Sequence, residues 1–280
     1  MLHVVTVHWR SATWIDPQLH FLALHTPDDT RVYASLDGLD EDHRSRFHYS
    51  TELEGTHAQK LDVLAAVVAE SAPDDDLLLF LDGDAFPIAS VDANVLQGLP
   101  LAAVRRDENL GDRQPHPCFC LTTVGFWKQI RGTWTEGYQW RNSRGEMVTD
   151  VGGNLLGILS GSNREWRALL RSNRTDLHPL WFGIYGDLVY HHGAGFRERI
   201  ARLDGSELSL EHALRSAILP KSVPYFGQLE RSIRMRRAQR RRDNWRASVG
   251  AEQNRLAEQV FESLLVDDHF YRVLLEPTTD

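Results

Sequence analysis

Hydrophobic positions in the first half of the chain form short unbroken runs separated by polar, helix-like segments. Such runs, bounded by turn residues, are typical of strands, and they predict strands over residues 2–9, 31–38 and 99–106. The run LLLFL at residues 77–81 does not alternate with polar positions, which predicts a strand buried on both faces, as in a parallel sheet.

The segments between these runs have the period of amphipathic helices. Residues 15–26 are predicted to form a helix that begins at Asp16 and Pro17. Residues 56–72 carry apolar side chains three and four positions apart, with Thr56 as the expected N-cap. The order strand, helix, strand, helix, strand predicts an α/β fold with a doubly wound, mixed but mostly parallel sheet.

Two carboxylates follow the buried run, one glycine apart, in the triplet Asp82-Gly83-Asp84. Because ligands bind at the carboxyl ends of strands in open α/β sheets, we expect this turn to belong to a site. Adjacent carboxylates repel one another unless a cation lies near them, and their oxygen ligands suit Mg²⁺ or Mn²⁺. The alternative is an Asp-Gly turn whose side chains cap backbone groups.

Composition is that of an ordinary globular protein. The 280 residues are 42% hydrophobic and 25% charged, which suffices for a sizeable core. The net charge of -8 argues against a general nucleic-acid binder, so we expect no nucleic-acid partner. The sequence contains neither a signal-peptide pattern nor an apolar run of membrane-spanning length, which favours a cytoplasmic protein.

The stretch HPCFC offers His116, Cys118 and Cys120 as zinc ligands. A second ligand cluster at zinc-site spacing is missing from the sequence. A disulfide between cysteines two positions apart would be strongly strained. We therefore expect both cysteines to be reduced and to pack in the core.

A resemblance to a known family rests on three features together. The segment FLDGDAFP, the helix opening HAQKLD and the preceding strand-helix-strand unit resemble the glycosyltransferases of the GT-A fold. The resemblance implies that Asp84 binds a divalent metal, Mn²⁺ or Mg²⁺, and that Asp82 faces the metal or the ribose. In that family the metal holds the diphosphate of a nucleotide sugar.

A later segment, IYGDLVYHHGAGFR at residues 184–197, resembles the part of the same family that supplies a histidine ligand, followed by a glycine and a basic residue. The resemblance implies His191 as a metal ligand and Arg197 as an additional positive charge near the diphosphate. His192 is the less favoured ligand because adjacent strand positions point to opposite faces. The alternative is a histidine pair that is satisfied in the core or at the surface.

Further candidates for binding the nucleotide sugar lie at the end of the first strand and at the start of the second helix: Thr6, His8, Trp9, Arg10, His57 and Lys60. Trp9 and Arg10 are suited to stacking on a base or bonding to it, with core packing as the alternative for Trp9. His57 and Lys60 lie one helical turn apart and can share a face. The alternative is that His57 and Lys60 are solvated side chains in the first turn of this helix.

Asp150 is the candidate catalytic base. It precedes a glycine pair and an apolar helix-like run in MVTDVGGNLLGIL, which resembles the family position where a carboxylate deprotonates the acceptor hydroxyl. The usual Glu-Asp doublet of inverting enzymes is replaced here by Thr149-Asp150. The alternative is an N-cap aspartate.

Residues 131–146 combine Trp134, Tyr138 and Trp140 with glycines and charges. Aromatic side chains on a mobile loop predict an acceptor lid. A twisted hairpin that packs its own aromatics fits the same sequence.

The expected domains follow from the resemblance and from composition. A catalytic domain is expected over residues 1–205, with a nucleotide-sugar half at 1–105 and an acceptor half at 106–205, followed by a helical, arginine-rich extension at 206–280. Arg231 to Arg246 concentrate positive charge, either as a solvated helix face or as a contact with an anionic membrane surface or an acidic partner. If this segment contacts a membrane, the protein is expected to associate peripherally with the inner membrane face.

The function implied is a metal-dependent transfer of one sugar from a nucleoside-diphosphate sugar to a sugar, small-molecule or peptide acceptor. Processive synthases resembling this fold carry a Gln-x-x-Arg-Trp motif and membrane spans, which this sequence does not show. Alternatives are a nucleotidyltransferase or phosphohydrolase that uses the same aspartates, and a non-catalytic transferase-like scaffold.

Overall fold

The computed structural model describes residues 1–174, 177, 181–193, 236, 240, 251 and 254–275. Contacts divide the chain into one compact unit, Met1–Phe196 with Leu264–Asp280, and a second unit, Arg197–Ser263. The domain boundary expected near residue 205 stays a prediction. The sheets and the candidate site lie in the first unit.

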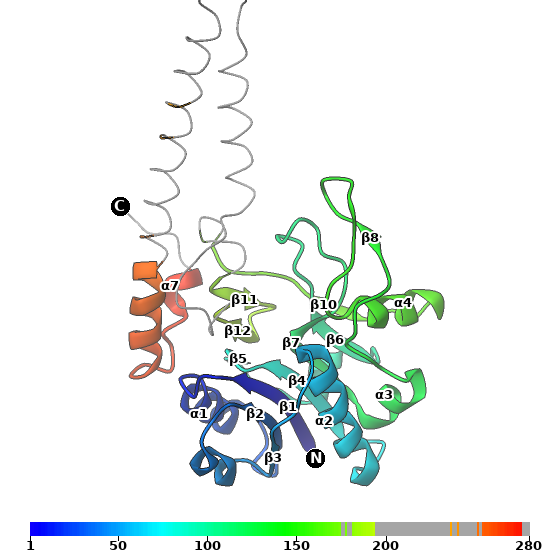
Figure 1. Ribbon diagram of the computed structural model, residues 1–280, viewed down its shortest axis with the longest axis horizontal. Helices are drawn as coiled ribbons and strands as arrows, with labels where there is room; N and C mark the ends of the chain where they lie inside the picture. Colours follow the sequence, from blue (N-terminus) through cyan, green and yellow to red (C-terminus); the bar gives the residue numbers. More distant parts are fainter. Residues whose placement is uncertain are drawn as a thin grey trace, which may run out of the picture. The chain divides into compact units, whose positions relative to one another are not determined.

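A seven-stranded sheet in the order β10-β6-β7-β4-β1-β2-β3 forms the centre of this unit (Figure 1). Every neighbouring pair of strands is parallel except the two that involve β7. The prediction of a mixed, mostly parallel sheet is therefore confirmed. The strands are β1 (Leu2–Trp9), β2 (Arg31–Asp37), β3 (Tyr49–Thr51), β4 (Leu77–Asp82), β6 (Leu101–Val104), β7 (His116–Thr123) and β10 (Arg167–Leu169).

Helices cover both faces of this sheet. On one face, α2 packs with α3 and α4 against alternate side chains of β1 and β4. On the other face, Leu22 of α1 and the 3-10 helix η2 pack against the remaining ones. This two-sided burial explains why the run in β4 is apolar without alternation. The helices are α1 (Ile15–His25), η1 (Glu41–Arg46), α2 (His57–Ser71), η2 (Ala93–Leu96), α3 (Val124–Ile130), α4 (Gly153–Gly161) and α7 (Arg272–Leu275), and residues 254–264 are also helical.

No helix among the described residues combines the length and the apolar composition that crossing a bilayer requires.

The start of α2 is held by a capping box. The Thr56 hydroxyl accepts a hydrogen bond from the Gln59 backbone N–H, and the Gln59 side chain accepts one from the Thr56 backbone N–H. The predicted N-cap is thus confirmed. Because α2 carries His57 and Lys60, this cap also fixes the entry of the helix next to the end of β4.

Thr56→Ala is expected to lower the free energy of unfolding by about 1 kcal/mol, because it leaves the Gln59 N–H without its partner. Urea denaturation measures this change, with Val63→Ala at an exposed position of the same helix as the control. A Thr56→Ala protein as stable as the wild type would contradict a stabilising role for the cap.

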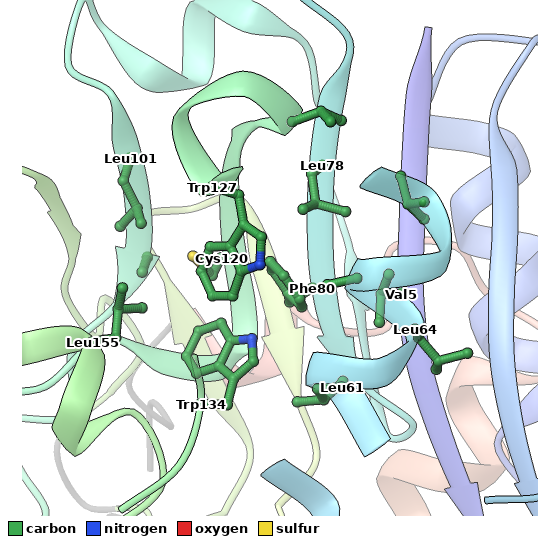
Figure 2. Close-up of a cluster of buried hydrophobic side chains, with 14 of the residues drawn as sticks. Val5, Leu61, Leu64, Leu78, Phe80, Leu101, Cys120, Trp127, Trp134 and Leu155 are labelled. Atoms are coloured by element: carbon green, nitrogen blue, oxygen red, sulfur yellow. The ribbon is translucent and has the colours of Figure 1, made fainter. Parts of the chain in front are cut away.

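The core on the α2 face contains a group of large aromatic side chains (Figure 2). Trp134 is fully buried, stacks on Trp127 with ring centroids 5.7 Å apart, and meets the edge of Phe80 at 5.1 Å. Trp140 is also buried and lies in a short hairpin of β8 (Trp140–Arg141) and β9 (Met147–Val148). The aromatic segment therefore forms a hairpin, and Trp134 is a core residue instead of a lid residue.

Cys118 and Cys120 are both buried and free, but they face opposite sides of the sheet. A register shift in the pairing of β7 with β6 marks an irregularity that turns the strand between them. With His116 they do not form a group of converging metal ligands in the described part of the chain. The expectation of reduced core cysteines agrees with this placement.

A second, three-stranded antiparallel sheet in the order β11-β12-β5 adjoins the carboxyl end of β4. Its strands are β5 (Ala85–Pro87), β11 (Gly183–Tyr185) and β12 (Val189–His191). In the pairing of β12 with β5, His191 lies opposite Ala85, the residue that follows Asp84. A segment about a hundred residues away in sequence is thereby brought to the aspartate turn.

Candidate active site

Asp82, Asp84 and His191 converge at the carboxyl end of β4. The Nε2 atom of His191 lies 3.6 Å from an Asp82 carboxylate oxygen and 3.5 Å from one of Asp84. One ligand atom from each of the three residues lies within 4.8 Å of the others. Asp84 and His191 are buried, with exposed fractions of 3% and 7%.

The electrostatics of this cluster suit a cation. Burial raises the pKa of Asp82, an effect that the charges of His57 and His191 oppose and that of Asp84 reinforces. Burial lowers the pKa of His191, but Cys118 and Asp84 raise it well above its ordinary value. The Oδ1 atom of Asp82 is buried and makes no hydrogen bond. Two carboxylates, one with an oxygen that makes no hydrogen bond, and an imidazole fit a divalent ion such as Mn²⁺ or Mg²⁺.

His192 points away from this cluster. Its Nδ1 atom lies 2.9 Å from the Tyr190 hydroxyl, and its ring lies 4.5 Å from that of Trp14. Burial lowers the pKa of His192 to about 4, so the ring is neutral near pH 7. The strand alternation that favoured His191 over His192 therefore holds in the structure.

His191→Ala is expected to weaken Mn²⁺ binding by more than the roughly 10- to 100-fold that loss of an outer partner of a metal ligand costs. His192→Ala, which removes a buried ring on the other face, should lower stability and leave Mn²⁺ affinity nearly unchanged. Calorimetric titration of both folded variants with Mn²⁺ measures the difference. Equal affinities would remove His191 from the metal site.

The first turn of α2 faces the aspartates. His57 Nε2 lies 3.4 Å from Asp82 Oδ1. Lys60 is buried and pairs through its ammonium group with the carboxylate of Asp37, the last residue of β2. Lys60 thus does not belong to a solvated turn. Asp37 was not singled out from the sequence, although an acidic residue at the end of the second strand is a known signal for ribose binding.

The four candidates at the end of β1 divide into two pairs. Thr6 and His8 are fully buried, and His8 Nε2 lies 3.1 Å from the Gln18 side-chain oxygen. Trp9 and Arg10 are exposed, with the Arg10 guanidinium 4.8 Å above the Trp9 ring. The structure thus places Trp9 and Arg10, but not Thr6 and His8, where a ligand has access.

Burial lowers the pKa of His8 to about 4. The unfolded chain then binds more protons than the folded protein between that value and the ordinary pKa, so acidification through this interval destabilises the fold. His8→Gln is expected to reduce the slope of unfolding free energy against pH by up to about 1.4 kcal/mol per pH unit, whereas exposed His48→Gln should not. Urea denaturation between pH 4 and 7 measures the slope, and an unchanged slope in His8→Gln would contradict a neutral His8.

Asp150 lies two residues before the N-cap of α4, which is Gly152. One Asp150 oxygen accepts a hydrogen bond from the Val151 N–H, and the other lies 3.5 Å from an Arg106 guanidinium nitrogen. Gly152 has a φ of +86°, and a Cβ there would lie 2.2 Å from the Pro115 carbonyl oxygen, so only glycine fits. The side chain of Asp150 is about half exposed and does not cap the helix.

Arg106 joins Asp150 to the aspartate cluster. It is largely buried, lies 3.2 Å from Asp112, and its charge lowers the pKa of Asp82. The Arg106 guanidinium therefore lies beside the candidate base, and its charge acts on the candidate metal ligand Asp82. Sequence reasoning missed Arg106 because an arginine after a strand carries no motif.

Two of the sequence-based candidates cannot be placed. Arg197 lies outside the described residues, as does most of the segment from Arg231 to Arg246. Within that segment Arg236 and Arg240 are described, and both are helical and exposed.

No protein-family model matches the sequence, and no curated protein matches it significantly. Among solved structures, the glycosyltransferase GlyE of Streptococcus pneumoniae TIGR4 is similar in two forms, each 16% identical, with TM-scores of 0.32 and 0.33. These matches cover 46% and 47% of this chain and 36% of GlyE. The galactosyltransferase LgtC, in complex with donor and acceptor sugar analogs, is 12% identical over 45% of this chain and 59% of LgtC, with a TM-score of 0.31.

The predicted α/β fold with a mixed, mostly parallel sheet is confirmed. Helices flank this sheet, and Asp82, Asp84 and His191 cluster at the carboxyl end of its central strand β4. This chain spans about a third of the length of GlyE.

Proposed function

We propose that this protein transfers a sugar from a nucleoside-diphosphate sugar to an acceptor hydroxyl with the help of Mn²⁺ or Mg²⁺. The observation that supports this proposal is the convergence of Asp82, Asp84 and His191 at the carboxyl end of β4. A divalent cation held there would stabilise the negative charge that develops on the leaving diphosphate.

On the donor side, the His57 ring lies 3.4 Å from Asp82, and Arg106 adds a positive charge that acts on it. Trp9 and Arg10 offer an exposed ring and guanidinium to the base. Asp37, which lies opposite Trp9 in the sheet, is linked to α2 through Lys60. Arg197 is retained as a proposed additional contact with the diphosphate. Thr6 and His8 are buried within β1 and do not touch the nucleotide.

On the acceptor side, Asp150 takes the proton of the attacking hydroxyl. The acceptor oxygen forms a bond with the anomeric carbon while the bond from that carbon to the diphosphate oxygen breaks, and the nucleoside diphosphate leaves with its electron pair. Arg106, 3.5 Å from Asp150, orients the carboxylate. Attack opposite to the leaving group gives inversion of the anomeric centre.

Thermal shift measurements with nucleoside diphosphates, with and without Mn²⁺, test the proposal directly. A ligand that binds only the folded protein raises the apparent melting temperature, so a rise that requires both nucleotide and Mn²⁺ is expected. Chromatography of the products then separates the activities. A transferase releases a nucleoside diphosphate, a nucleotidyltransferase releases pyrophosphate, and a phosphohydrolase releases inorganic phosphate. Absence of any metal-dependent nucleotide binding would contradict the proposal and favour a scaffold.

A further inference from the structure

A hollow of about 480 Å³ lies next to the loop that follows β6. Its lining contains three arginines, Arg105, Arg113 and Arg141, one carboxylate, Asp107, and the side chain of Trp166. The volume falls within the range of small-molecule sites in proteins. This hollow is separate from the Asp82–Asp84–His191 cluster, none of whose residues lines it.

The positive charge in the hollow is only partly compensated. The Arg105 guanidinium donates two hydrogen bonds to the Asp107 carboxylate, at 2.7 and 2.9 Å. Among the described residues, Arg113 and Arg141 have no carboxylate partner, and Arg141 donates only to the Gly145 carbonyl oxygen. In a chain whose net charge is -8, two uncompensated guanidinium groups around one hollow indicate a place for an anion.

The two loops that form the hollow are tied to each other. The Ser143 backbone N–H donates to the Leu110 carbonyl oxygen at 2.8 Å. The Asn142 side-chain oxygen accepts hydrogen bonds from the backbone N–H groups of Arg144 and Glu146, which holds the hairpin turn. A site held in this way loses little conformational freedom when a ligand binds.

Both walls of the hollow continue into the candidate active site. Arg106, which contacts Asp150, directly follows Arg105 in the chain. The β8–β9 hairpin, which supplies Arg141, leads directly to Asp150. Both walls are therefore close in the chain to residues of the proposed acceptor side, Arg106 and Asp150.

We propose that this hollow binds an anionic group, a phosphate or a carboxylate, carried by the acceptor. Arg113 and Arg141 supply the contacts, and Trp166 offers an apolar wall to the body of the same molecule. This inference rests on the proposed function in calling the ligand an acceptor, but the anion site itself does not depend on nucleotide or metal.

Calorimetric titration of the full chain at low ionic strength, without nucleotide or Mn²⁺, tests the anion site. Glucose 6-phosphate and glucuronate serve as phosphate and carboxylate probes, and glucose as the neutral control. We expect at least one anionic probe to bind more tightly than glucose, and its affinity to fall as salt is added. The double variant Arg113→Gln/Arg141→Gln should lose about 10-fold or more of that affinity.

The matched control is Arg31→Gln/Arg131→Gln, which removes the same charge from exposed positions outside the hollow. It should leave binding of the probe unchanged. Equal loss in both double variants, no loss in the first, or binding of neither anion would overturn the inference. Metal-dependent nucleotide binding, measured on the same proteins, should be retained by both variants, so a failure of the proposed function is seen separately.

Discussion

The Asp84→Asn protein is expected to remain folded and to lose Mn²⁺-dependent binding of nucleoside diphosphates. Asn has nearly the shape of Asp but lacks the charge that a divalent ion requires of this ligand. Asp84 is buried and lies 3.5 Å from His191, so no other carboxylate in the cluster can take its place without moving the turn. Thermal shift and calorimetry with nucleoside diphosphate, with and without Mn²⁺, measure the loss.

The control for this substitution is Asp75→Asn, an exposed aspartate at a turn on the same chain. It should bind nucleotide and metal as the wild type does. An Asp84→Asn protein with normal affinity and metal dependence would remove the aspartate pair from the proposed metal site. Loss of folding in Asp84→Asn would instead indicate that the carboxylate caps the turn.

Asp150→Asn is expected to bind the nucleotide-sugar donor normally but to transfer sugar roughly 10²-fold more slowly or worse, the usual scale of a lost general base. The amide cannot accept the acceptor proton, while the hydrogen bond from Val151 can still be made to its oxygen. Initial rates of nucleoside diphosphate release, with donor affinity measured in parallel, separate the two effects. The product should have the inverted anomeric configuration.

Glu165→Gln, an exposed change of the same kind, serves as the control for Asp150→Asn and should not alter the rate. Two results would refute the role of Asp150. One is a normal turnover by the Asn variant, and the other is a product that retains the configuration of the donor. In either case the base must be sought among other residues near Arg106.

The elements that lie next to the candidate site were predictable because each is determined by short-range chemistry. Strand β4 is apolar at every position before its last residue, Asp82, which is the local pattern of a strand covered on both faces. The Thr56 cap depends on a residue three positions later in the chain. The predicted ends of β1 and α2 agree with the structure for the same reason.

Features that depend on pairing across the chain were harder to predict. The hairpin with Trp140, and the burial of Trp134 between Trp127 and Phe80, follow from packing that no local pattern encodes. Cys118 and Cys120 face opposite sides of the sheet because of an irregularity in the pairing of β7, where simple alternation places them on one side.

The α/β order and the position of Asp82 and Asp84 at a strand end could be predicted from the hydrophobic periodicity of the chain. Side-chain alternation along a strand predicted that His191 and His192 face opposite sides, whereas the choice of His191 came from the family resemblance. The approach of His191 to the two aspartates and the contact of Arg106 with Asp150 emerge from the folded arrangement alone. These contacts depend on the pairing of β12 with β5 and on the course of the loop after β6, which are long-range interactions whose energy is realised only when the whole sheet has formed.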